Sequence, residues 1–313
     1  MGFTSALVVP EEGIFRGTSV LVTTGDGAAP GLIVRSDVAQ GIAFERGGFG
    51  EGYPTSLMGA IAAVRQGLED ARRHQIWQAR YDEDPSGLKR PDSVSAWAPL
   101  ARVASGEMPV IFDMESPANV LRALAVGREY GLRAMVIGSG LEYEIAGDLA
   151  RAGVPVILPL HYPDKPEMKD QGATLDVDTR DLQRYLGART SAAALERAGV
   201  AFALGTCHMK KATEFTANLK EALDAGLEPE AALAALTTAP ARMFGVDRSL
   251  GRLAPGMAAD VVVRDKDPFA EGSKVEKVFV DGVEYPVEEK KPGDAKDKGW
   301  KGSRPEGGEG GAR

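Results

Sequence analysis

The sequence predicts an α/β fold arranged as a TIM-like (β/α) barrel, and three observations support that prediction. Short runs of apolar residues recur through the middle of the chain, and helical patterns separate them. Such runs indicate parallel strands that are buried on both faces of a sheet. No turn carries a G-x-G-x-x-G or P-loop pattern, which favours a barrel over a dinucleotide-binding fold. The clearest runs are 109–112, 134–137, 154–160 and 200–204.

Capping residues mark the helices that accompany these strands. Ser116 precedes Pro117, a pair typical of a helix start, and Gly131 ends the same helix. Nearer the N-terminus, Thr55 or Ser56 caps a long helical pattern that continues past residue 77. Further helices are expected over 141–152, 191–198 and 213–225.

The remaining segments read as short strands and loops. The stretch 24–53 is rich in glycine and proline, which predicts a loop-rich segment. The polar stretch 161–190 is interpreted as a long loop at the catalytic face of the barrel. Strands are expected at 3–9, 19–23, 31–34, 41–44, 259–264, 275–280 and 283–287.

These elements predict three regions. Residues 1–249 form the barrel, residues 250–287 contribute strands to a small C-terminal β-sandwich, and the Lys-, Glu- and Gly-rich residues 288–313 form a disordered tail. Met1 is followed at once by a strand pattern without the charged start of a signal peptide. We therefore expect further sequence upstream; the compartment stays unassigned, with the cytoplasm as the default.

Composition narrows the classes of partner. The net charge is −8 and no long basic run occurs, which argues against nucleic acid. No apolar run reaches the roughly 18–20 residues of a membrane helix. The single cysteine, Cys207, excludes a disulfide within the chain. A small-molecule ligand and a homo-oligomer both remain compatible with the sequence.

Three motifs near the C-terminus follow one another in a specific order. They are Leu236–Gly245 (LTTAPARMFG), Leu250–Asp265 (LGRLAPGMAADVVVRD) and Val278–Gly282 (VFVDG). Thr238 is expected to cap a helix, and Asp281 with Gly282 to form a hairpin turn. Together the motifs resemble the C-terminal signature of the amidohydrolase superfamily, closest to its imidazolonepropionase-like group. The resemblance extends back to about residue 100 through the strand and helix patterns described above.

The resemblance implies a metal-dependent hydrolase of non-peptide C–N bonds, with zinc or another divalent ion activating water. Its ligands would be a His-x-His on strand one, histidines on strands five and six, and an aspartate on strand eight. No His-x-His occurs here, and strand one is expected to be absent. Asp113 falls at the strand-five position, Gly138 or Ser139 at strand six, and Cys207 at strand eight.

Several interpretations of these positions remain open. The favoured one is a degenerate site that is weak or inactive, with or without a bound divalent metal. The alternative is a non-catalytic binding or scaffold domain of a larger or oligomeric protein. An altered metal site would draw on candidates at strand ends: Asp113, Glu115, His161, Cys207 and His208. Cys207 is also the candidate catalytic residue, as a nucleophile with His161 or His208 as base. Glu11, Glu12 and Arg16 are interpreted as a charged loop, with substrate contact as the alternative.

Overall fold

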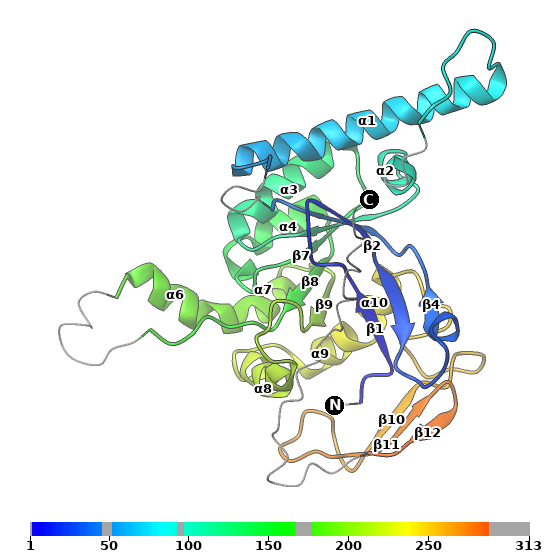
Figure 1. The fold of residues 1–313 in the computed structure, drawn as a ribbon. Helices are drawn as coiled ribbons and strands as arrows, with labels where there is room; N and C mark the ends of the chain where they lie inside the picture. The colour runs from blue at the N-terminus through cyan, green and yellow to red at the C-terminus, as the bar shows by residue number, and fades with distance from the viewer. Residues whose placement is uncertain (1, 46–51, 93–96, 167–176, 288–313) are drawn as a thin grey trace, which may run out of the picture.

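The computed structural model describes residues 2–45, 52–92, 97–166 and 177–287. Its centre is a six-stranded sheet with the order β2-β5-β6-β7-β8-β9 (Figure 1). Neighbouring strands from β5 to β9 run parallel, whereas the edge strand β2 runs antiparallel to β5. The strands are β2 (Phe15–Thr18), β5 (Gln40–Ala43), β6 (Val110–Asp113), β7 (Ala134–Ile137), β8 (Val156–Pro159) and β9 (Phe202–Gly205).

Helices cover one face of this sheet, and local capping explains where several of them begin and end. The Ser56 hydroxyl accepts a hydrogen bond from the Gly59 N–H, and Ser116 caps the next long helix in the same way. Gly131 ends that helix in the left-handed conformation, as predicted. The helices are α1 (Leu57–Glu83), α2 (Trp97–Ala104), α3 (Pro117–Tyr130), α4 (Ala146–Ala152), α6 (Thr179–Gly187), α7 (Ser191–Arg197), α8 (Phe215–Asp224), α9 (Pro229–Leu236) and α10 (Thr238–Met243).

The two faces of the sheet bury different cores, because side chains alternate along each strand. Val110, Phe112 and Val136 point into the larger core, which the helices complete. Ile111 and Ile137 point the other way, into a smaller core that includes Leu21 and Phe244. Asp113 follows Ile111 by two residues, so its side chain leaves the same face as this smaller core.

Two small antiparallel sheets lie beside the main one. The first has the order β1-β3-β4 and the second β10-β11-β12. The Asp26 N–H donates to the Tyr285 hydroxyl at 2.6 Å, which ties the two sheets together. Asp281 and Gly282 both have positive φ values, as the predicted hairpin turn requires. The strands are β1 (Ser5–Val8), β3 (Val20–Thr23), β4 (Ile33–Arg35), β10 (Val261–Arg264), β11 (Val275–Val280) and β12 (Val283–Tyr285).

The structure corrects three expectations and adds one strand that was not expected. The expected loop 161–190 contains α6, whose start is capped by Asp178. The expected helix 141–152 is split into a 3-10 turn η2 (Glu142–Glu144) and α4, and β2 was not expected at all. Thr238 does not cap α10; it is the first residue of that helix. Further 3-10 turns are η1 (Ala29–Leu32), η3 (Ala188–Thr190) and η4 (Ala212–Glu214).

Some expectations fall outside the described residues, namely the tail 288–313 and most of the glycine-rich stretch 47–52. Within the described part of the chain, α1 is the longest helix, and no helix combines the length and apolar character that crossing a membrane demands.

Candidate functional site

A cluster of ion pairs gathers around Asp113, the last residue of β6. Arg16, on the edge strand β2, forms an ion pair with Asp113 Oδ2, and its other terminal nitrogen lies 3.7 Å from Glu45. The Arg16 and Asp113 side chains are only 12% and 10% exposed. This is therefore a largely buried ion pair rather than a solvated surface contact.

His208 completes the cluster from the opposite edge of the sheet. Its Nε2 lies 2.9 Å from Asp113 Oδ1, and its side chain is 30% exposed. Asp113 Oδ1 has no well-aligned hydrogen bond among the described residues, so we treat this contact as an electrostatic one. His208 has a backbone φ of +62°, a conformation that residues other than glycine rarely adopt. Its position thus depends on the surrounding turn holding it there.

The charges of the cluster shift the protonation of its members. Burial is the largest influence on Asp113 and acts to raise its pKa, but His208 and Arg16 outweigh it, and the pKa is lowered. Contact with the Asp113 carboxylate raises the pKa of His208 above its ordinary value, although burial opposes the change. The Asp113 anion is therefore favoured by the Arg16 guanidinium, and it in turn favours the protonated form of His208.

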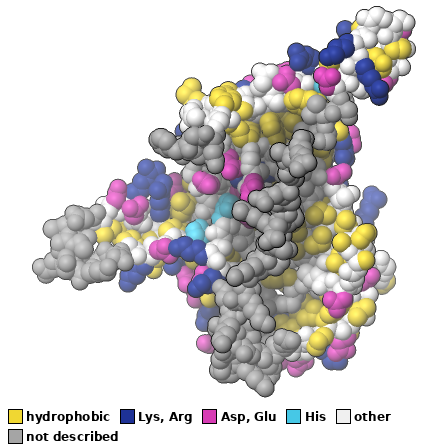
Figure 2. All heavy atoms as spheres, in the orientation of Figure 1, with side chains coloured by type: hydrophobic (Ala, Val, Ile, Leu, Met, Phe, Trp, Pro, Cys, Tyr) yellow, Lys and Arg dark blue, Asp and Glu magenta, His cyan; other side chains and the backbone are white. Residues whose placement is uncertain are grey.

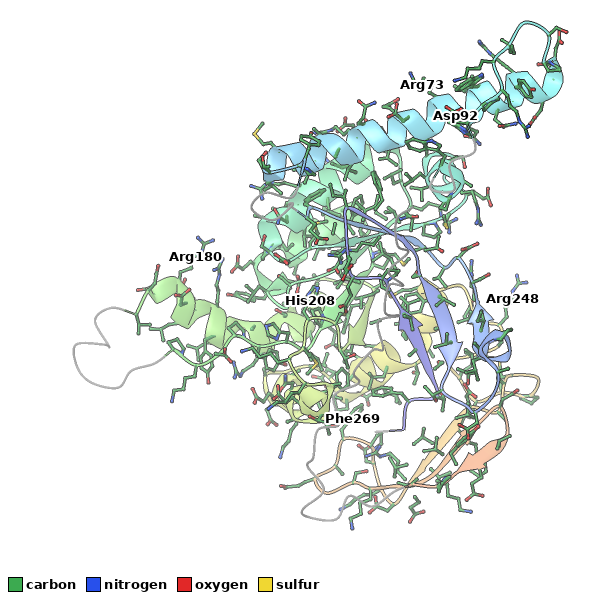
Figure 3. The ribbon with its side chains drawn as sticks, in the orientation of Figure 1. Arg73, Asp92, Arg180, His208, Arg248 and Phe269 are labelled. Carbon is green, nitrogen blue, oxygen red and sulfur yellow. The ribbon has the colours of Figure 1, made fainter. Side chains whose placement is uncertain are left out.

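The other predicted site residues lie around this cluster without joining it. Burial, followed by the nearby Asp113 charge, raises the pKa of the Cys207 thiol to about 12. Burial also lowers the pKa of His161, and the charge on His208 lowers it further. Glu115 acts on His208 only through its charge. In Figure 2, histidine side chains lie beside acidic ones near the centre of the face shown, and Figure 3 places His208 in the middle of the molecule.

A buried carboxylate lies against the end of β7, where the sequence analysis placed the strand-six ligand. A Cβ atom at Gly138 would overlap the carboxylate of Glu142, which is fully buried. Glu142 Oε1 accepts hydrogen bonds from the Ser139 N–H at 2.6 Å and from the Ser139 hydroxyl at 3.1 Å. Burial raises the pKa of Glu142, although the Ser139 hydrogen bonds oppose that shift. Glu142 therefore organises the turn after β7, and a side chain at residue 138 would disrupt it.

These residues do not fit a catalytic metal ion. The two oxygens of Asp113 already contact Arg16 and His208, and burial opposes formation of the Cys207 thiolate, the form that metal ions bind. Gly138 offers no donor atom, and the Ser139 hydroxyl is hydrogen-bonded to Glu142. Among the described residues, no three or more His, Cys, Asp or Glu side chains form a group suited to hold a metal ion.

Sequence reasoning placed Asp113 and His208 at strand ends, and the structure brings them together. It missed the role of Arg16, because β2 lacks a strong strand pattern and its contact spans 97 residues. It also missed the role of Glu142, which fell within the helix expected over 141–152. Glu11 lies close enough for its charge to act on Cys207.

Comparisons with known proteins point to one family. The model of the amidohydrolase family matches residues 158–285. A stretch of 58 residues is 45% identical to the amidohydrolase tasK of Hapsidospora irregularis, covering 18% of this chain and 6% of that protein. An amidohydrolase from Thermotoga maritima MSB8 has a similar structure, with a TM-score of 0.74 and 22% identity over 90% of this chain and 71% of that one.

A zinc-bound adenosine deaminase from Xanthomonas campestris is more distant. Its TM-score is 0.42 and its identity 18%, over 79% of this chain and 60% of that one, so it adds nothing to the assignment. The fold is that of a mixed α/β protein with a parallel sheet. The family match and the curated relative support membership of the amidohydrolase superfamily for the C-terminal part of the chain, and the structural likeness shows a shared fold.

Proposed function

We propose that this chain is a degenerate amidohydrolase, weak or inactive as a metal-dependent hydrolase of non-peptide C–N bonds, in which Arg16 supplies the positive charge that a metal ion would supply. The single observation that carries the proposal is the largely buried Arg16–Asp113 ion pair, with His208 on the second carboxylate oxygen. A metal ion at Asp113 would have to displace Arg16 and leave a guanidinium group without its partner in a poorly solvated place.

The architecture proposed with this function is a TIM-like barrel with a β-sandwich. β6 and β9 are three strands apart in the sheet order, which in a flat sheet separates them by about 14 Å. His208 follows β9 and yet lies 2.9 Å from Asp113 on β6, which supports a strongly curved sheet that is concave toward the cluster. The contact between Asp26 and Tyr285 supports a sandwich formed by the two small sheets.

Metal analysis tests the proposed function. The protein would be purified after growth with added zinc, cobalt and manganese, dialysed, and analysed by plasma mass spectrometry. We expect far less than one metal ion per chain, and no change in thermal stability on adding zinc. A stoichiometric metal that is lost in both Asp113→Asn and Cys207→Ala would overturn the proposal, because an altered metal site would then exist.

A second candidate is a non-catalytic binding or scaffold domain, and one observation favours it. The C-terminal half of α1 and the whole of α6 project from the body of the molecule (Figure 1), and α6 buries none of its residues. Projecting helices of this kind suit contacts with another chain, including a second copy of this one. Light scattering over a range of concentrations tests self-association, and a monomer throughout would count against a homo-oligomer.

A further inference from the structure

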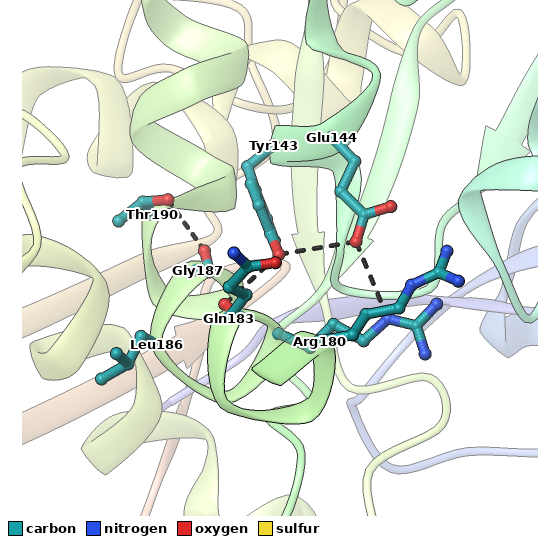
Figure 4. A pocket seen from close by; sticks show the side chains of 8 residues that line it. Tyr143, Glu144, Arg180, Gln183, Leu186, Gly187 and Thr190 are labelled. Atoms are coloured by element: carbon teal, nitrogen blue, oxygen red, sulfur yellow. Dashed lines mark hydrogen bonds and ion pairs between the residues drawn. The ribbon is translucent and has the colours of Figure 1, made fainter. Parts of the chain in front are cut away.

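A surface pocket lies between η2 and α6. None of the residues around Asp113 lines it. Its volume is 610 Å³, within the range of roughly 300–1,000 Å³ usual for small-molecule sites. Tyr143 and Glu144 line it from η2, and Arg180, Arg184 and Leu186 line it from α6 (Figure 4). In Figure 4 Arg180 and Leu186 lie toward opposite sides, with Tyr143 between them. The pocket thus has a charged side and an apolar side.

The charged side carries more positive than negative charge. Arg180 and Arg184 are four residues apart on α6, so their side chains leave the same face of the helix. Glu144 is the one carboxylate among the described residues that line the pocket, and its Oε1 lies 3.7 Å from Arg184 Nε, beyond hydrogen-bond distance. The Arg184 Nε is buried and has no hydrogen-bond acceptor among the described residues. A polar donor in that state favours an additional acceptor.

The apolar side is held in a fixed position. A Cβ atom at Gly187 would overlap the Tyr143 ring, so glycine there allows the ring to lie against the end of α6. The Tyr143 N–H donates to the Ser191 hydroxyl at 3.3 Å, and that buried hydroxyl donates to the Gly140 carbonyl at 2.8 Å. Leu186, which also lines the pocket, is 65% exposed. The ring and Leu186 therefore offer a wall against which an apolar group can pack.

We propose that this pocket binds a small monocarboxylate with an apolar body, its carboxylate against Arg180 and Arg184 and its body against Tyr143 and Leu186. Two arginines and one glutamate leave a single net positive charge, which matches one negative charge on the ligand. A guanidinium group also pairs with a carboxylate through two parallel hydrogen bonds, which gives the arginines an acceptor of matching geometry. Such a site is separate from the proposed loss of metal chemistry and does not depend on it.

Calorimetric titration of the full chain tests the site with two matched probes. N-acetyl-L-phenylalanine carries the carboxylate, and N-acetyl-L-phenylalanine amide is its neutral counterpart. We expect the acid to bind with an affinity at least about tenfold higher than that of the amide. Either Arg184→Met or Arg180→Met should lower the affinity for the acid by about tenfold. Arg151→Met is the matched control, because Arg151 is an exposed arginine on α4 that is paired with Asp148 and does not line the pocket.

Circular dichroism melts establish that each variant is folded before titration. Three outcomes would overturn the proposal: equal binding of acid and amide, an equal loss in Arg151→Met, or no binding of the acid up to about 10 mM. Gly187→Ala gives a further check from the apolar side. It should weaken both probes by displacing the Tyr143 ring, and unchanged binding of both would contradict the assigned wall.

Discussion

Replacing Arg16 by methionine removes one partner of a largely buried ion pair while keeping most of the side-chain volume. Removing one member of a fully buried pair costs about 3–5 kcal/mol, because the remaining charge loses its compensation. Asp113 is 10% exposed and retains His208, so we expect the lower end of that range, a loss of about 3 kcal/mol in the free energy of unfolding. The double variant Arg16→Met/Asp113→Leu should recover most of the loss, since it buries no unpaired carboxylate.

Urea unfolding followed by circular dichroism measures both effects, with the midpoint shifting and the slope unchanged. Arg65→Met is the matched control, because Arg65 pairs with Glu129 at a surface site where both side chains are more than 40% exposed. That variant should lose less than about 1 kcal/mol. The reasoning is refuted if Arg16→Met costs no more than this control, or if the double variant loses as much as the two single changes added together.

Three further predictions concern protonation and packing. Contact with Asp113 raises the pKa of His208, so protonated His208 stabilises the folded protein fully below the unfolded pKa of about 6.5. This stabilisation is lost as the pH rises through the folded pKa, and the urea midpoint should fall with it. The His208→Gln variant should not show that fall in midpoint. Gly138→Ala should cost about 2 kcal/mol by overlapping Glu142, whereas Gly127→Ala, with its nearest neighbour at 3.6 Å, should not destabilise the protein in the same urea assay. With a thiol pKa of about 12, Cys207 should react with iodoacetamide at pH 8 at least about 100-fold more slowly in the folded protein than in urea, and similar rates would contradict its burial.

The sequence predicted the parts of the fold that depend on local signals. Consecutive apolar residues located β7 at Ala134–Ile137, and Ser116 with Gly131 located both ends of α3, because capping needs only neighbouring residues. The motif Leu236–Gly245 pointed to the family whose model matches residues 158–285, because it too is a local pattern. A signal for α6 was also present, in Asp178 at its start and in the spacing of Leu182 and Leu186, but the surrounding polar residues hid it.

The candidate site was only half predictable. Asp113 and His208 could be placed at strand ends, yet their contact depends on how the sheet curves, which no local pattern records. Arg16 is harder still, because it lies on a four-residue edge strand with no apolar alternation, and its partner is 97 residues away. The sequence predicted that metal ligands are replaced, but it did not predict that Arg16 and His208 contact Asp113.

In the proposed degenerate site, Arg16 and His208 compensate the charge of Asp113, so replacing the metal ligands need not destabilise the face of the sheet that carries Asp113. A carboxylate that is nine-tenths buried requires a nearby cation, and a metal ion can serve only when several donors converge on it. A guanidinium group needs just the one carboxylate, and it remains charged at every pH at which the protein folds. Arg16 lies on the edge strand β2 and His208 follows the edge strand β9, so their contacts with Asp113 link β6 to both edges of the sheet. In the proposed degenerate site, these charges would therefore stabilise the sheet as well as disfavour a metal ion.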